Sequence, residues 1–179
     1  MKPKQNKAYK ILVEQIAQVV QQSRVHAVKT VQQTTNLLYW EIGKLIIERQ
    51  NEYGWGASIV DNLSMDLQAK IGAGQSWSSR NLRLMRQLYE DYSQLTVSEK
   101  SNVKQIVSHL TKSNTRRLSS NKTLPNVKQP VSHLENIKLL VSEVPWGQNI
   151  LILQKVKDMQ ARLFYLNATI KNGWSRAAT

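Results

Sequence analysis

Residues 78–92 read SSRNLRLMRQLYEDY and indicate the fold class more clearly than any other stretch of the chain. On an α-helix, which turns about 100° per residue, its apolar side chains fall on one side and its three arginines on the other. Ser78 or Ser79 is a suitable N-cap for this helix. The stretch therefore predicts an amphipathic helix whose core face is formed by Leu82, Leu84, Met85, Leu88 and Tyr89.

Apolar residues recur at steps of three and four in other parts of the chain, which is the spacing of a helix face. Two successive helices are expected before the glycines at 54 and 56, and the turn IGAGQSW at 71–77 separates a third helix from residues 78–92. A last helix is expected soon after Pro145, continuous through Ile170. No run alternates with period 2, so we expect an all-α fold of several helices. The expected helices are marked by Leu12, Ile16 and Val19, by residues 28–45, by residues 57–70 and by residues 152–170.

The composition excludes several classes of protein. The 179 residues suffice for one domain with an insertion. The chain has no cysteine, which excludes disulfides, thiol catalysis and thiolate metal sites. Its longest aliphatic run, at 150–153, is far shorter than the ~20 residues of a membrane-spanning helix, and no signal peptide is recognisable. We expect a cytoplasmic protein with no membrane partner.

The charge is strongly positive. Twenty-five basic and twelve acidic side chains leave a net charge of +13. Residues 1–10 carry four lysines and no acidic residue, so we expect a basic, flexible arm there. Such a surplus favours a polyanionic partner, and nucleic acid is the commonest. The alternative is a solvated basic surface that only keeps the protein soluble.

A short internal duplication interrupts the helical pattern. NVKQIVSHL at 102–110 recurs as NVKQPVSHL at 126–134, and two copies are too few for a solenoid. Residues 101–134 contain six basic residues and no acidic ones. We therefore expect 101–135 to be a basic, mobile insertion. His109 and His133 recur because the unit is duplicated, and without a third ligand they do not predict a metal site.

The arginine face of the helix at 78–92 is the candidate binding site. Arg80 lies in the first turn, where the helix dipole disfavours a cation by roughly 0.3–1 kcal/mol. A bound anion such as phosphate would reverse that effect, because backbone N–H groups and Arg80 would converge on it. With the preceding helix and its glycine-containing turn, the helix resembles a loose helix-turn-helix, a motif that binds DNA. The predicted nucleic-acid-binding residues are Ser79, Arg80, Arg83 and Arg86.

Two structural explanations compete with this interpretation. Exposed arginines are commonly only solvated, and Arg86 has Glu90 one turn later as an ion-pair partner. The turn is also longer than the three or four residues of a standard helix-turn-helix. The tryptophans Trp40, Trp55, Trp77, Trp146 and Trp174 could stack on bases, but packing at helix junctions is the favoured explanation.

Several motifs resemble, in order, the N-terminal domain of YhcG-type proteins of the PDDEXK nuclease superfamily. The resemblance covers most of 9–100 and 137–176, and it implies a helical domain over 11–100 and 136–179. It also implies a DNA-handling role and, in relatives, a following nuclease domain, which we expect to be absent here. The motifs are LYWEIGKLI at 38–46, YGWGASIVDNLSMDL at 53–67, WSSRNLRLMRQLY at 77–89, VPWGQNILIL at 144–153 and KDMQARLFYLNATIKNGWSR at 157–176.

No catalyst is expected. The resembled nucleases bind a divalent metal through an Asp and an acidic residue two positions before a Lys, whereas Asp61, Asp66 and Asp158 lie on predicted helices without partners. Phosphate-binding glycine loops and nucleophile motifs are missing too, so we expect neither a metal nor a cofactor. The sequence predicts a non-catalytic helical domain that binds nucleic acid, with DNA favoured and RNA left open as the alternative.

Two alternatives remain. One is a protein-interaction module, whose heptad-like faces at 28–45 and 152–170 would form a homodimer or dock a separately encoded nuclease. The other is a truncated gene remnant, suggested by the internal duplication and by the chain ending just after NGWSR, where relatives continue.

Overall fold

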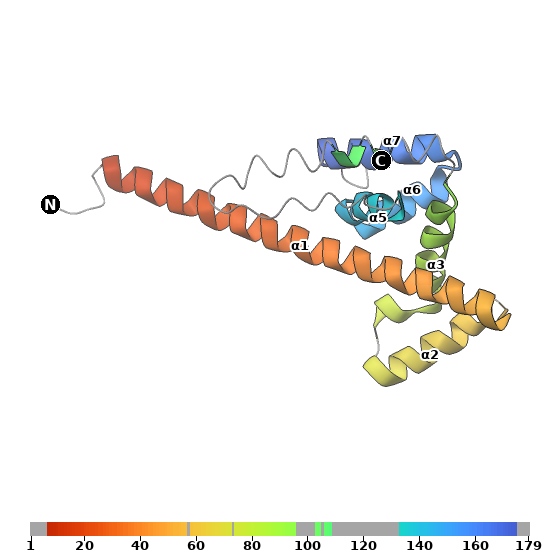
Figure 1. The fold of residues 1–179 in the computed structure, drawn as a ribbon. Coiled ribbons are helices and arrows are strands. Elements are labelled where there is room, and N and C mark those ends of the chain that lie inside the picture. The colour runs from red at the N-terminus through yellow and green to blue at the C-terminus, as the bar shows by residue number, and fades with distance from the viewer. Residues whose placement is uncertain are drawn as a thin grey trace, which may run out of the picture.

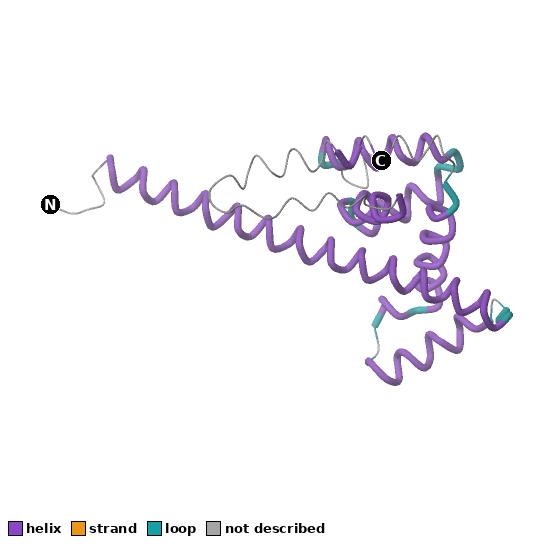
Figure 2. The backbone as a smooth tube through the Cα atoms, viewed as in Figure 1, coloured by secondary structure: helices purple, strands orange, loops and turns teal. Residues whose placement is uncertain are grey.

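The computed structural model describes residues 7–56, 58–72, 74–95, 103–104, 106–108 and 133–174. Every regular element in these ranges is helical, with no strand, so the predicted all-α fold is confirmed (Figures 1 and 2). A very long first helix runs through the molecule, and the shorter helices gather around its C-terminal half (Figure 1). The helices are α1 (Lys7–Tyr53), α2 (Ile59–Ile71), the 3₁₀ turn η2 (Gln75–Trp77), α3 (Ser79–Ser93), α5 (His133–Glu143), α6 (Trp146–Lys155) and α7 (Met159–Asn172).

Helix α1 is one element of 47 residues, so the prediction of two successive helices was wrong. Residues 20–27 contain neither Gly nor Pro, and their polar residues are compatible with a helix, so the chain continues through them. Most of the heptad-like face at 28–45 points outward: Val28, Val31, Leu38 and Leu45 are exposed, whereas Ile42 is partly buried against the core. The buried face of α1 consists instead of Asn36, Tyr39, Trp40, Gly43 and Ile46.

Helix α1 crosses α3 at Gly43. A Cβ atom at this position would lie 2.2 Å from the carbonyl oxygen of Met85, a distance that no packed carbon can occupy. Beside the crossing, Trp40 packs edge-on against Tyr89, with 5.3 Å between ring centroids. Only a glycine lets the two backbones approach this closely. The crossing therefore fixes the position of α3 on α1.

The main core joins α1 and α3 to the C-terminal helices. It includes two valines of the first repeat copy, Val103 and Val107, which lie in short helical stretches. This part of the expected insertion at 101–135 is therefore packed into the domain, and α5 begins at His133. Residues 109–132 lie outside the described ranges, as do residues 1–6 of the expected basic arm. The other core residues include Trp40, Leu88, Tyr92, Ile137, Leu140, Ile152, Leu163 and Leu166.

Two buried asparagines hold the turn between α5 and α6. The Asn36 side chain of α1 donates to the carbonyl oxygens of Ser142, at 3.1 Å, and of Val144, at 2.7 Å. Asn149 of α6 donates to the Val144 oxygen as well, at 2.8 Å. These bonds satisfy carbonyls at the end of α5, which have no partners within a helix. The turn is thereby attached to α1, and it positions Trp146 at the start of α6.

The expected continuous helix through 152–170 is broken, so that prediction was wrong. Val156 is extended, and Asp158 caps α7 by accepting from the Ala161 N–H at 2.7 Å. Arg162, which is buried, donates to the carbonyl oxygens of Leu153 and Val156 and to Asp91. A buried arginine thus satisfies the end of α6. Ile152, Leu163 and Leu166 are all in the core, so this face is not available for a homodimer.

Candidate nucleic-acid interface

The start of α3 forms as the sequence predicts. Ser78 is the N-cap, in an extended conformation, and its hydroxyl accepts from the Asn81 N–H at 3.3 Å. The apolar face of α3 is buried in the core, with Leu84 only partly covered. Ser79 is the first helical residue and is half-buried. The opposite face of α3 carries the three predicted arginines.

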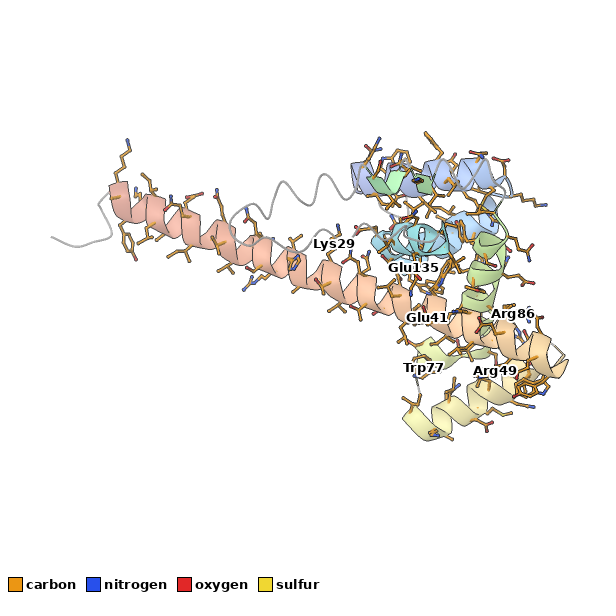
Figure 3. All side chains as sticks on the ribbon, in the orientation of Figure 1. Lys29, Glu41, Arg49, Trp77, Arg86 and Glu135 are labelled. Atoms are coloured by element: carbon orange, nitrogen blue, oxygen red, sulfur yellow. The ribbon has the colours of Figure 1, made fainter. Side chains whose placement is uncertain are left out.

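These arginines have different surroundings and do not form one uniform stripe. Arg83 donates to both carboxylate oxygens of Asp61 on α2, each at 2.7 Å. Arg86 on α3 is half-buried beside α1 (Figure 3). Its guanidinium is 3.4 Å from the amide oxygen of Gln50. Both therefore connect α3 to neighbouring helices, and the contact of Arg86 is with Gln50 rather than with the expected Glu90.

Arg80 differs from the other two. It lies in the first turn of α3 and is exposed. Within the described ranges its guanidinium has no hydrogen bond and no ion-pair partner. The helix dipole makes this a disfavoured place for a cation, and no side chain of the described residues offsets the cost. Arg80 is therefore available to a ligand.

A groove of about 710 Å³ lies beside Arg80, between α3, α6 and the turn before α3. The starts of α3 and α6 both border it, through Ser78 and Arg80 on one side and Trp146 and Gly147 on the other. None of its lining residues is acidic. Helix N-termini and an unpaired arginine together favour an anion in such a groove.

Hydrogen bonds hold the wall of the groove in place. The Asn81 amide donates to the carbonyl oxygen of Ser76 at 2.9 Å and accepts from the Trp146 indole N–H at 3.0 Å. The Tyr39 hydroxyl donates to Ser76 Oγ at 3.1 Å, and its ring packs edge-on against Trp146 at 4.8 Å. Sequence reasoning missed Tyr39 and Asn81 as site residues, because the wall combines α1, α3, α6 and η2. Trp146 had been assigned to packing, and it does pack.

Neither a metal-ligand cluster nor a membrane-spanning helix occurs among the described residues. In the described part of the chain, no three His, Cys, Asp or Glu side chains are grouped so that they could bind a metal ion. His109 lies outside that part. Among the same residues, no helix has the length and apolar character needed to cross a bilayer.

Comparisons with known proteins place the chain in a family. It is 25% identical over 172 residues to the Escherichia coli (strain K12) protein described as "Putative nuclease YhcG". The match covers 93% of this chain and 42% of that relative, so this chain spans less than half of the relative's length. No solved structure matches. The profile described as "DUF1016 N-terminal domain" matches residues 15–126 and 99–178, which together include nearly all of the helical elements. The chain therefore belongs to the DUF1016 N-terminal domain family.

Proposed function

We propose that this chain is a DNA-binding domain without a catalytic site of its own, and that DNA phosphates bind at the start of α3. The observation that carries the proposal is the unpartnered guanidinium of Arg80 beside a groove with no acidic lining residue. The net charge of +13 supports a polyanionic ligand. The similarity to a protein described as a nuclease supports nucleic acid in particular.

The four predicted site residues have separate roles in this proposal. Arg80 contacts phosphate directly, and Ser79 offers its backbone N–H at the helix start. Arg83 and Arg86 position the helix, because their side chains already contact Asp61 and Gln50. Arg83 remains half exposed, so it adds long-range attraction to the DNA without being the main contact.

Helices α2 and α3 are the two helices of the proposed helix-turn-helix. The Ser64 hydroxyl of α2 donates to the carbonyl oxygen of Trp77 at 2.7 Å, and the Gln68 amide donates to Ser64. The Arg83–Asp61 pair adds a second link between the helices. These contacts hold the turn against α2 and leave Arg80, in the first turn of α3, exposed. Such motifs place their DNA contacts at that end of the second helix.

Fluorescence anisotropy of a labelled duplex over a salt series tests the proposal. We expect Arg80→Ala to weaken binding roughly tenfold and to lower the slope of log K against log salt by about one. Lys171→Ala is the matched control, since it also removes one exposed charge but lies at the end of α7, away from the groove. Equal losses in the two variants would show that net charge alone explains binding. A folded wild type that binds no DNA would refute the proposal and favour a protein-interaction role.

A further inference from the structure

The N-terminal half of α1 carries an apolar stripe that nothing in the described chain covers. Residues 7–31 are all exposed, and most of this part of the helix projects beyond the other helices (Figure 1). Near its end, Lys29 pairs with Glu143 of α5 at 2.7 Å. Eight of these residues are Val or Ile, whose branched side chains give the helix little intrinsic stability. A helix of this composition is stable mainly through packing of its apolar side.

The stripe lies on the opposite side of α1 from the bundle. Leu38 and Leu45 are both exposed. Each lies two residues from a buried residue, Leu38 from Trp40 and Leu45 from Gly43. Two residues correspond to about 200° around the helix, which is nearly the opposite side. Followed toward the N-terminus at steps of three and four, the same side continues to the start of the helix. Its members there, defined here as the outer stripe, are Tyr9, Val13, Ile16, Val20, Arg24, Ala27 and Val31.

From the outer stripe we infer that α1 pairs with α1 of a second copy of this chain, in antiparallel orientation. The steps along the stripe are 4, 3, 4, 4, 3 and 4, which read the same in both directions. A two-fold axis at Val20 therefore superposes the stripe on itself. Tyr9 then faces Val31 of the other copy, and Val13 faces Ala27. Such self-complementarity is what a symmetric dimer requires.

The charges select the antiparallel orientation. Between residues 11 and 28 the only charged side chains are Glu14 and Arg24. In the antiparallel pair, Glu14 of each chain lies at nearly the same height as Arg24 of the other. The offset between the two residues along the helix axis is only about 3 Å. A parallel pair would place Glu14 on Glu14 and Arg24 on Arg24, and it would bring Lys7 and Lys10 of both chains together.

The contact is large enough for a dimer. The outer stripe is about 33 Å long from Tyr9 to Val31, and its side chains are about half exposed. With Leu12 and Val19 at its edge, covering it would remove roughly 700 Å² per chain from water, close to the ~800 Å² per partner of a stable interface. The two bundles would lie at opposite ends of the pair.

Sedimentation equilibrium of the full chain tests the pairing. We expect a species of about twice the 20.5 kDa chain mass, and we expect Val20→Glu to weaken dimerisation roughly a hundredfold, because two glutamates would face each other on the axis. Val25→Glu is the matched control: Val25 is also exposed in α1 but lies outside the stripe, and its variant should stay dimeric. A monomeric wild type at all concentrations, or a dimer that tolerates Val20→Glu, would overturn the inference.

Disulfide trapping tests the orientation, since the chain has no cysteine of its own. Val13→Cys and Ala27→Cys chains, when mixed, should form a mixed disulfide in preference to either homodisulfide. The reverse preference would overturn the antiparallel arrangement. Circular dichroism of the Val13→Cys and Ala27→Cys chains should match that of wild type, because both substituted side chains are exposed and outside the bundle.

Discussion

The two halves of α1 are a single helix with opposite surroundings. Residues 32–53 carry the buried face of α1, which includes a polar side chain, Asn36, and a glycine, Gly43. Residues 7–31 expose a row of valines and isoleucines to solvent. The difference shows that apolar content alone does not locate the core of this protein. Close backbone approach and satisfied hydrogen bonds decide which face packs inside.

Among substitutions in the packed half of α1, residues 32–53, Gly43→Ala should lower the stability of the protein most. The new methyl group would overlap the Met85 carbonyl, which belongs to the backbone and cannot move alone, so we expect a loss of about 3 kcal/mol of unfolding free energy. Urea denaturation followed by circular dichroism measures it. Ser23→Ala, the control in the projecting half, should change stability by no more than about 0.5 kcal/mol. Similar losses in the two variants would contradict the assigned crossing.

Asn36→Ala should have the next largest effect, about 2 kcal/mol, because it removes both hydrogen bonds from α1 to the α5–α6 turn. Gln22→Ala removes an exposed amide from the projecting half and should be nearly neutral. Thermal unfolding of both variants makes the comparison. If Asn36→Ala were also neutral, the turn would not depend on α1.

Of the three substitutions in the packed region, Tyr92→Phe should have the smallest effect on the unfolding free energy at neutral pH. The Tyr92 hydroxyl is buried with no partner among the described residues, so we expect a gain of up to about 1 kcal/mol. Tyr9→Phe, which removes an exposed hydroxyl from the projecting half, should leave stability within about 0.5 kcal/mol of wild type.

The pH dependence gives a second measurement on the same variant. Burial raises the pKa of Tyr92 above its ordinary value, so the unfolded chain loses the phenolic proton first. Wild-type stability should therefore fall as the pH rises above about 10, the pKa of an unperturbed tyrosine. Tyr92→Phe should reduce that fall. Part of it should remain, since burial also raises the pKa of Tyr89. An unchanged profile would contradict the burial of Tyr92.

The sequence predicted the elements that local patterns determine. The bounds, N-cap and core face of α3 follow from residues 78–92, and α2 forms close to the predicted range of 57–70. The break between α6 and α7 was missed because Val156 keeps the apolar spacing in phase. It arises from the Asp158 cap and from the contacts of Arg162, which depend on the folded arrangement.

The candidate site was predicted only in part, for a similar reason. Arg80, Arg83 and Arg86 look equivalent on a helical projection of α3. Their difference comes from Asp61 and Gln50, which lie 22 and 36 residues away in the sequence. The groove beside Arg80 likewise needs α6 to be folded against α3. Long-range contacts of this kind leave no local signal in a single sequence.

Site-specific photo-crosslinking to a labelled DNA duplex tests most directly the claim that the start of α3 binds DNA. Gln154 is exposed and lines the groove, whereas Phe164 is exposed on α7 and does not line it, so a photoreactive phenylalanine derivative at each position gives a matched pair. The account predicts crosslinking from position 154 that disappears when Arg80→Ala is added, and little from position 164. Crosslinking from position 164 that equals or exceeds that from 154 would contradict it.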